Sequence, residues 1–381
     1  MITEQKIFFL QELSVYTRHF LTDDMLLLDI ETTGLSATRH FIYCIGCSYR
    51  TGSDITIQLF FAENREQEIE ILAALAKLLQ THRTIVTFNG TTFDLPFLKK
   101  RYIASSTELL SDTWKDGAYL SSDITSVDLY REACRLKNVL VLPDYKQKSI
   151  ETFLGCERED LYSGKELIAQ YHLYQKNPSK EQELLHNLLL HNLEDVRGMY
   201  DLVELLTYID FFRGNFQICN ISCQSADQKT FCNIRLQPEY HFPQKLTWIS
   251  EEASLILNGE AALLSFPVHH GFLRHYFPDF KNYYYLPEED TIIHKSLGTY
   301  VDSAHRQKAT RENCFLAKEC DYLMHTAPIK NVYLRREFHD TASYFELPAW
   351  NNNFEMDIEF PESVRNSLYD FISAYLNQLL K

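Results

Sequence analysis

Four acidic residues and one histidine stand at positions from which they could hold metal ions. Asp29 and Glu31 follow the apolar segment LLL at 26–28 and are two residues apart, so on a strand their side chains leave the same face. Two carboxylates this close repel each other unless a cation lies between them, and a hard divalent ion such as Mg²⁺ accepts carboxylate oxygens. An isolated pair of this kind is more simply explained as the solvated end of a strand.

Further acids downstream also have two explanations. Asp94 lies in FNGTTFDLPFL (88–98) and would be either a metal ligand or the N-cap of a helix. In HNLEDV (191–196), His191 precedes Asp195 by four residues, which places both on one face if the segment is helical throughout. Alternatively, Asn192 caps a helix that has Asp195 in its first turn.

The elements that would position these residues follow a recognisable order. Strands are predicted at about 26–31, 41–50 and 54–62, the last two joined as a hairpin through TGSD. A helix over 64–82, a strand over 84–89 and a helix over 93–103 follow, then short helices at 128–136 and 148–155 and a helical region over 180–208. This order predicts an α/β domain over residues 1–210, with a mixed sheet flanked by helices.

From residue 211 the pattern changes. Segments such as EASLILNGEAALLSFPV indicate strands and turns, and SVRNSLYDFISAYLNQLLK (363–381) indicates a closing amphipathic helix. We therefore expect a smaller β-rich α+β accessory domain over residues 211–381 that binds substrate or a partner.

Composition limits the class of protein. The chain of 381 residues has 45% hydrophobic residues and a net charge of −15, which favours a packed protein that is not a general polyanion binder. No apolar run approaches the length of a membrane span, and the N-terminus lacks the features of a secretory signal. The nine cysteines are scattered without a framework. Together these features indicate a cytoplasmic protein with reduced thiols.

Taken together, the three acidic segments are more specific than any one of them. DIETTGL, FNGTTFDLPFL and HNLEDV resemble, in this order, the three motifs of the DEDD superfamily of 3′→5′ exonucleases, which have a ribonuclease H-like fold. The bacterial YprB-like branch is the most similar, and YKQKSIETFLGCERED (145–160) is similar to a connecting segment of that branch. The resemblance covers about residues 20–210.

The resemblance implies a two-metal-ion site for Mg²⁺ or Mn²⁺. Asp29, Glu31, Asp94 and Asp195 would be the metal-binding acids. The chemistry of an imidazole near neutral pH and the spacing to Asp195 suggest His191 as general base. One form of the superfamily has a His five residues before the final Asp, and another has a Tyr four residues before it. Here His191 has the residue type of the first form and the spacing of the second. The substrate-binding residues would be Thr32, Thr33, Gly34, Leu35, Asn89 and Phe93, with Phe93 equally well explained by core packing.

We therefore expect a metal-dependent nuclease that hydrolyses DNA or RNA from a 3′ end, which is expected to be single-stranded. The alternatives are a structure-specific endonuclease of the same fold and a non-catalytic nucleic-acid-binding protein with a degenerate nuclease fold.

Three other features have more than one explanation. Lys99, Lys100 and Arg101 would contact backbone phosphate or form a solvated helix face. The stretch 281–313 combines tyrosines with Lys and Arg, which suits single-stranded nucleic acid but also a β-rich core with charges in solvent. Cys219, Cys223 and Cys232 lack zinc-site spacing, so buried free thiols are expected.

Overall fold

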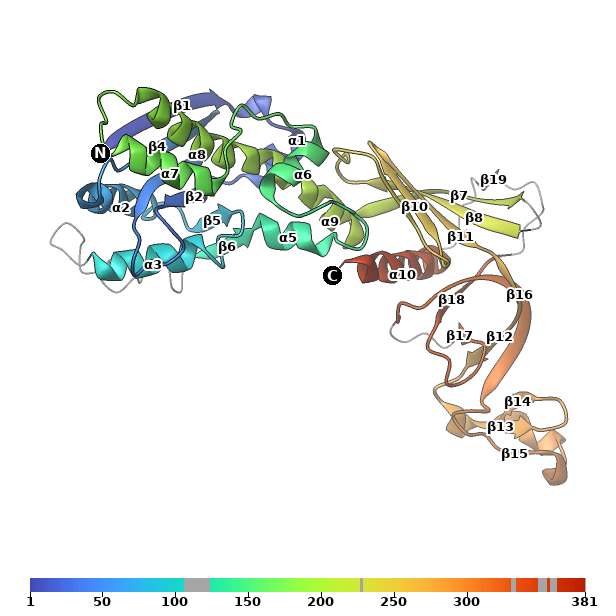
Figure 1. The fold of residues 1–381 in the computed structure, drawn as a ribbon. Coiled ribbons are helices and arrows are strands. Elements are labelled where there is room, and N and C mark those ends of the chain that lie inside the picture. The colour runs from blue at the N-terminus through green and yellow to red at the C-terminus, as the bar shows by residue number, and fades with distance from the viewer. Residues whose placement is uncertain (106–123, 227–228, 330–333, 349–354, 357–361, 381) are drawn as a thin grey trace. The chain divides into compact units, whose positions relative to one another are not determined.

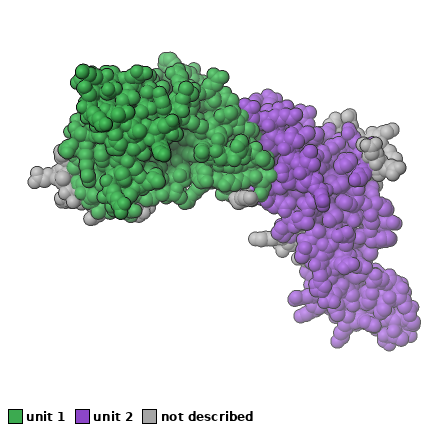
Figure 2. All heavy atoms as spheres, viewed as in Figure 1, with its two compact units in different colours: residues 1–209 green, residues 210–381 purple. Residues whose placement is uncertain are grey.

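The chain folds into two compact units (Figure 2), Met1–Ile209 and Asp210–Lys381. The computed structural model describes residues 1–105, 124–226, 229–329, 334–348, 355–356 and 362–380. Each unit has its own sheets and its own buried side chains.

The N-terminal unit is built on a six-stranded sheet in the order β1-β4-β3-β2-β5-β6 (Figure 1). Its strands are β1 Ile2–Phe9, β2 Met25–Thr32, β3 Ile42–Thr51, β4 Asp54–Phe61, β5 Thr84–Thr87 and β6 Thr125–Asp128. The central strand β2 pairs antiparallel with β3 and parallel with β5, which confirms the predicted mixed sheet. The β3–β4 hairpin also forms as predicted, with Thr51 opposite Asp54.

Helices cover both faces of this sheet (Figure 1). The described helices begin with α1 Val15–Phe20, α2 Glu68–Leu78 and α3 Asp94–Ala104, and continue with α5 Leu129–Arg135, α6 Gln147–Leu154, α7 Gly164–Tyr174, α8 Gln182–Leu202 and α9 Leu206–Phe212. Helices α2 and α3 share a core with one face of the sheet, whereas α8 packs on the other face against β2, β3 and β4.

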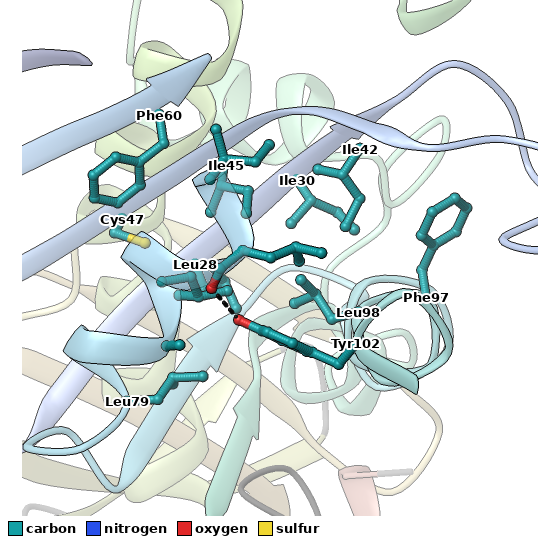
Figure 3. Packing of buried hydrophobic residues seen from close by; sticks show 14 of the residues in the cluster. Leu28, Ile30, Ile42, Ile45, Cys47, Phe60, Leu79, Phe97, Leu98 and Tyr102 are labelled. Atoms are coloured by element: carbon teal, nitrogen blue, oxygen red, sulfur yellow. Dashed lines mark hydrogen bonds between the residues drawn. The ribbon is translucent and has the colours of Figure 1, made fainter. Parts of the chain in front are cut away.

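The core under α2 and α3 decides which way the β2 carboxylates point. Leu28 and Ile30 belong to this cluster (Figure 3), together with Phe97, Leu98 and Tyr102 of α3. Because side chains alternate along a strand, Asp29 and Glu31 project to the opposite face, toward α8. The hydroxyl of Tyr102 donates to the carbonyl oxygen of Leu72 at 2.8 Å, which links α3 to α2.

A buried ion pair further fixes α3. The guanidinium of Arg101 pairs with the Glu68 carboxylate, and its Nη1 donates to the Ala37 carbonyl at 3.0 Å. Both explanations suggested by the sequence are therefore wrong for Arg101, which neither belongs to a phosphate-binding surface nor lies on a solvated helix face. Its neighbours Lys99 and Lys100 are exposed.

The C-terminal unit is rich in β-strands, as predicted. Its sheets have the orders β19-β7-β8-β11-β10-β9, β17-β12-β16-β18 and β14-β13-β15. The strands are β7 Phe216–Ala226, β8 Lys229–Pro238, β9 Leu246–Ile249, β10 Ser254–Asn258, β11 Ala261–Pro267, β12 His269–Tyr276, β13 Tyr283–Leu286, β14 Thr291–His294, β15 Gln307–Lys308, β16 Phe315–His325, β17 Leu334–Arg335, β18 Ser343–Glu346 and β19 Glu355–Met356. The closing helix α10 spans Glu362–Leu379, and its Phe371 and Tyr375 pack against Phe266 of β11.

The aromatic and basic stretch of this unit contains internal cation–π contacts. The Tyr284 ring centroid lies 4.8 Å from Arg306 Cζ and 5.7 Å from Lys295 Nζ. These contacts hold β13 to the segments that follow it.

The cysteines are free thiols. Cys44 and Cys47 lie on opposite faces of β3, since side chains three residues apart on a strand point to opposite sides. Cys47 joins the core under α2 and α3, whereas Cys44 Sγ lies 3.4 Å from Asn192 Oδ1 of α8. Cys232 is buried, but Cys219 is exposed, so the expectation of buried thiols is wrong for that residue. Among the described residues, no helix is both long and apolar enough to cross a membrane.

Candidate active site

The carboxylates of β2 meet the side chains of α8. Asn192 Nδ2 donates to Asp29 Oδ2 at 2.7 Å. Glu31 Oε1 lies 3.2 Å from His191 Nε2, and the Tyr43 hydroxyl donates to Glu31 Oε2 at 3.3 Å. The strand end and the helix, which are more than 150 residues apart in sequence, thus form one polar cluster.

Asp94 joins this cluster from the start of α3. It is the first residue of the helix rather than its N-cap, and its Oδ1 accepts a hydrogen bond from the backbone amide of Ile30 at 3.2 Å. The capping explanation is therefore wrong for Asp94. Burial, above all, raises the pKa of its carboxyl group to about 7, and the charges of Glu31 and Asp128 add to this effect.

The four acids influence one another electrostatically. Burial raises the pKa of Asp29 well above its ordinary value, and the negative charges of Asp195, Asp94 and Glu31 raise it further. The hydrogen bond from Asn192 acts in the opposite direction. Carboxylates that oppose one another's ionisation in this way form a site that a bound cation would stabilise.

Helix α8 contributes a histidine as well as an acid. His191 and Asp195 lie in its interior, one turn apart, and His191 Nε2 is 3.2 Å from Asp195 Oδ2. The alternative in which Asn192 caps a helix is wrong, because α8 begins at Gln182.

A third carboxylate, that of Asp160, contacts the other nitrogen of the His191 ring. His191 Nδ1 lies 2.6 Å from Asp160 Oδ2. Burial alone would lower the pKa of His191, but the hydrogen bond to Glu31 and the charges of Asp195 and Glu31 raise it to about 9.

Arg158 is a functional candidate that sequence reasoning missed. Its Nη1 donates to Asp195 Oδ1 at 2.5 Å, while its Nε and Nη2 donate to the two carboxylate oxygens of Glu151. Gln147 Nε2 donates to the Asp195 carbonyl at 2.8 Å. These residues and Asp160 lie in the segment 145–160. The similarity of this segment to a connecting segment of the YprB-like branch was the sequence signal that could have pointed to them.

The predicted substrate residues lie next to the acids but differ in environment. Thr32 and Thr33 are buried, while Leu35 exposes 86% of its surface beyond Gly34. Asn89 has a left-handed backbone with φ 63°, and its Oδ1 accepts from Thr92 Oγ1 at 2.6 Å. Phe93 is half-buried and packs against the core, with its ring centroid 5.5 Å from that of Phe97.

Asp128 acts as a helix cap. It is the N-cap of α5 and accepts from the Tyr130 amide at 3.1 Å. Its carboxylate also accepts from the amides of Asn89 and Thr91 at 2.8 and 3.1 Å. Asp128 thus orders the loop between β5 and Asp94, which carries Asn89 and Phe93.

Three donor groups lie close enough to share one ion. Among the described residues, the ligand atoms of Glu31, His191 and Asp195 all lie within 4.8 Å of one another. Carboxylate oxygens and an imidazole nitrogen suit divalent ions such as Mn²⁺ and Zn²⁺, and the carboxylates also suit Mg²⁺. The donor set therefore fits a divalent metal ion.

Comparison with known families assigns the fold of this unit. A model of the RNase H superfamily matches residues 26–207, a span that contains every predicted site residue. Residues 26–207 therefore form a ribonuclease H-like domain. The match agrees with the resemblance to DEDD-type exonucleases and supports a nuclease, but it does not test the assignment to the YprB-like branch.

Two solved structures are similar to the chain at low identity. A family B DNA polymerase from the hyperthermophilic archaeon Pyrobaculum calidifontis is 20% identical with a TM-score of 0.36, over 49% of this chain and 25% of the polymerase. E. coli exonuclease I in complex with a dT13 oligonucleotide is 11% identical with a TM-score of 0.30, over 61% of this chain and 54% of the exonuclease.

The similarity thus spans about a quarter of the polymerase and about half of exonuclease I. At these identities and TM-scores it assigns neither an activity nor a substrate. A comparison with curated proteins finds no match.

Proposed function

We propose that the ribonuclease H-like domain is a divalent-metal-dependent 3′→5′ exonuclease that hydrolyses phosphodiester bonds of DNA or RNA. The observation that supports this most is the convergence of Asp29, Glu31, Asp94 and Asp195 from β2, α3 and α8 on one cluster. The 3′→5′ polarity and the use of two ions come from the motif resemblance.

The four acids would hold the metal ions. One or two divalent ions bound there would lower the pKa of an attacking water and stabilise the charge that develops on the scissile phosphate. Because the protein as a whole has a net charge of −15, the ions would also make the site attractive to a phosphate backbone.

Neighbouring side chains and one backbone amide orient three of the acids. Asn192 orients Asp29, the Ile30 amide orients Asp94, and Arg158 holds one oxygen of Asp195. Such fixed geometry matters because the rate of phosphoryl transfer depends on prearranged charge rather than on charge that must reorganise during the reaction.

The loops beside the acids would bind the terminal nucleotide. Leu35 is exposed four residues after Glu31, which suits an apolar contact with the last base. Asn89 and half-buried Phe93 precede Asp94 on the loop that Asp128 orders. We propose that these residues, with Thr32, Thr33 and Gly34, form the binding site for the 3′ end.

The decisive experiment measures product lengths. Purified full-length chain is incubated with Mn²⁺ or Mg²⁺ and 5′-labelled single- and double-stranded DNA and RNA, with or without phosphorothioate linkages at the 3′ end. We expect a ladder that shortens from the 3′ end and is blocked by those linkages. An Asp29→Asn variant should lose the activity, whereas Asp23→Asn, which changes an exposed acid, should retain it.

Other outcomes would support the alternatives. A discrete internal product would indicate an endonuclease. Binding of nucleic acid without turnover by the wild-type chain, in either metal, would indicate a non-catalytic binding protein.

A further inference from the structure

We propose that His191 is itself a metal ligand, and that with Glu31 and Asp195 it forms a centre of one imidazole and two carboxylates that prefers Mn²⁺ to Mg²⁺. This inference rests on the proposed metal-dependent function and specifies the ion. It also gives His191 a different role from the general base expected from the sequence.

The spacing of the donor atoms supports a shared ion. His191 Nε2 lies 3.2 Å from Glu31 Oε1 and 3.2 Å from Asp195 Oδ2. Adjacent ligands of an octahedral ion with bonds of about 2.1 Å lie about 3 Å apart. The nitrogen is therefore separated from each of the two oxygens as neighbouring ligands on one ion would be, and all three groups have ligand atoms within 4.8 Å of one another.

Each of the three donor groups is anchored through its other polar atom. Glu31 Oε2 accepts from the Tyr43 hydroxyl at 3.3 Å, and Asp195 Oδ1 accepts from Arg158 Nη1 at 2.5 Å. His191 Nδ1 donates to Asp160 Oδ2 at 2.6 Å. Only the atoms that face one another remain for an ion, which is the arrangement that outer hydrogen bonds impose on metal ligands.

The Asp160–His191 contact is the most informative of these. A histidine that binds a metal through one ring nitrogen commonly donates its other N–H to a carboxylate, which fixes the tautomer and the ring orientation. Asp160 is itself held by Lys148 Nζ at 2.7 Å and by the Tyr162 amide at 3.0 Å. His191 exposes only 7% of its surface, so this geometry is built into the domain rather than adopted by a free side chain.

The donor set also favours one type of ion. Carboxylates suit Mg²⁺ and Mn²⁺ alike, whereas an imidazole ligand suits transition metals and adds little for Mg²⁺. A general base, by contrast, needs a ring nitrogen that is free to accept a proton. With Nδ1 bonded to Asp160 and Nε2 bonded to the ion, His191 has none.

Pulsed electron paramagnetic resonance of the Mn²⁺-loaded full-length chain tests the proposal directly. We expect a hyperfine coupling from an imidazole nitrogen in the wild-type chain and its loss in His191→Gln. His186→Gln is the matched control, because His186 is an exposed histidine of the same helix, and it should retain the coupling. Circular dichroism would establish that each variant is folded.

Calorimetric titration of Mn²⁺ and Mg²⁺ gives an independent measurement. We expect Asp160→Asn to keep the nitrogen coupling but to weaken Mn²⁺ binding by about tenfold, as outer-sphere changes do. His191→Gln should weaken Mn²⁺ binding by more than the roughly tenfold effect expected for Asp160→Asn and should change Mg²⁺ binding little. The preference for Mn²⁺ over Mg²⁺ should therefore fall.

The outcomes separate this inference from the proposed function. If the wild-type chain cleaves nucleic acid and binds Mn²⁺ but shows no nitrogen coupling, His191 is not a metal ligand. The nuclease proposal would remain intact in that case. An unchanged preference for Mn²⁺ over Mg²⁺ in His191→Gln would overturn it as well. Failure to bind either ion, with no cleavage, would contradict both proposals.

Discussion

Gly46 of β3 lies directly opposite Asp29 of β2 in the antiparallel ladder. A Cβ atom at Gly46 would come within 2.6 Å of Val196 Cγ2 and even closer to the side-chain oxygen of Asn192, both on α8. The missing side chain therefore lets α8 approach the sheet closely enough for Asn192 to reach Asp29. A residue without any reactive group thus controls the distance between the acids of β2 and those of α8.

The first prediction follows from this close approach. Gly46→Ala should displace α8, reduce nuclease turnover by at least about tenfold and destabilise the chain by about 1–3 kcal/mol, as overpacking of a core does. Urea denaturation and the nuclease assay measure the two effects. Gly164→Ala is the control, because an added Cβ there meets no atom within 4 Å. Full activity of Gly46→Ala would show that the site does not depend on this contact.

The second prediction is that the Asp29 carboxylate is required for activity but lowers the stability of the metal-free chain. Asp29→Asn removes one of the mutually repelling charges while its side-chain oxygen can still accept from Asn192. The variant should lose turnover by at least about a hundredfold and yet melt a few degrees higher than the wild type in the presence of a chelator. Differential scanning calorimetry provides the melting temperature, and a lower value would contradict the proposed charge repulsion.

The elements that carry the site were predictable because their signals are local. Leu28 and Ile30 alternate with Asp29 and Glu31, and this pattern is enough to predict a buried strand with both acids on one face. Strand β1 was not predicted, since most of its residues are exposed, half of them are polar and it lacks an apolar alternation. The four-residue strand β6 gave no such signal either.

The contacts around the site depend on tertiary structure and could not be read from spacing. Asp160 and Arg158 reach His191 and Asp195 across more than 30 residues of sequence, and nothing local distinguishes them from other charged residues of their segment. The same holds for Arg101, which follows two exposed lysines but is turned inward by its pairing with Glu68. Only the packing of α3 on α2 decides which of these cations is buried.

The third prediction tests this buried pair. Arg101→Gln leaves the Glu68 carboxylate buried without its main cation and should destabilise the chain by about 3–5 kcal/mol. Lys100→Gln, at an exposed position of the same helix, should change stability by less than about 0.5 kcal/mol. Urea denaturation of both variants gives the comparison. Equal, small effects would show that the ion pair contributes little.

The fourth prediction is that the metal-free chain loses stability as the pH rises from about 4 to about 9. Asp94 has a pKa of about 7 in the folded chain against an ordinary value of 3.8, and His191 has one of about 9 against 6.5. Both groups bind protons more tightly when folded, so their contributions are present at low pH and are lost as the pH passes through these values. Each shift corresponds to about 3–4 kcal/mol.

Two variants test which group causes the loss of stability in each part of this pH range. Asp94→Asn should flatten the decline between about pH 4 and 7, and His191→Gln the decline between about 6.5 and 9. Saturating Mn²⁺ should reduce both declines, because a bound cation stabilises the deprotonated site. Urea denaturation in chelator and in Mn²⁺ across this range gives the measurement. A decline between about pH 4 and 7 in Asp94→Asn that is as steep as in the wild-type chain would show that other groups cause the loss of stability in that range.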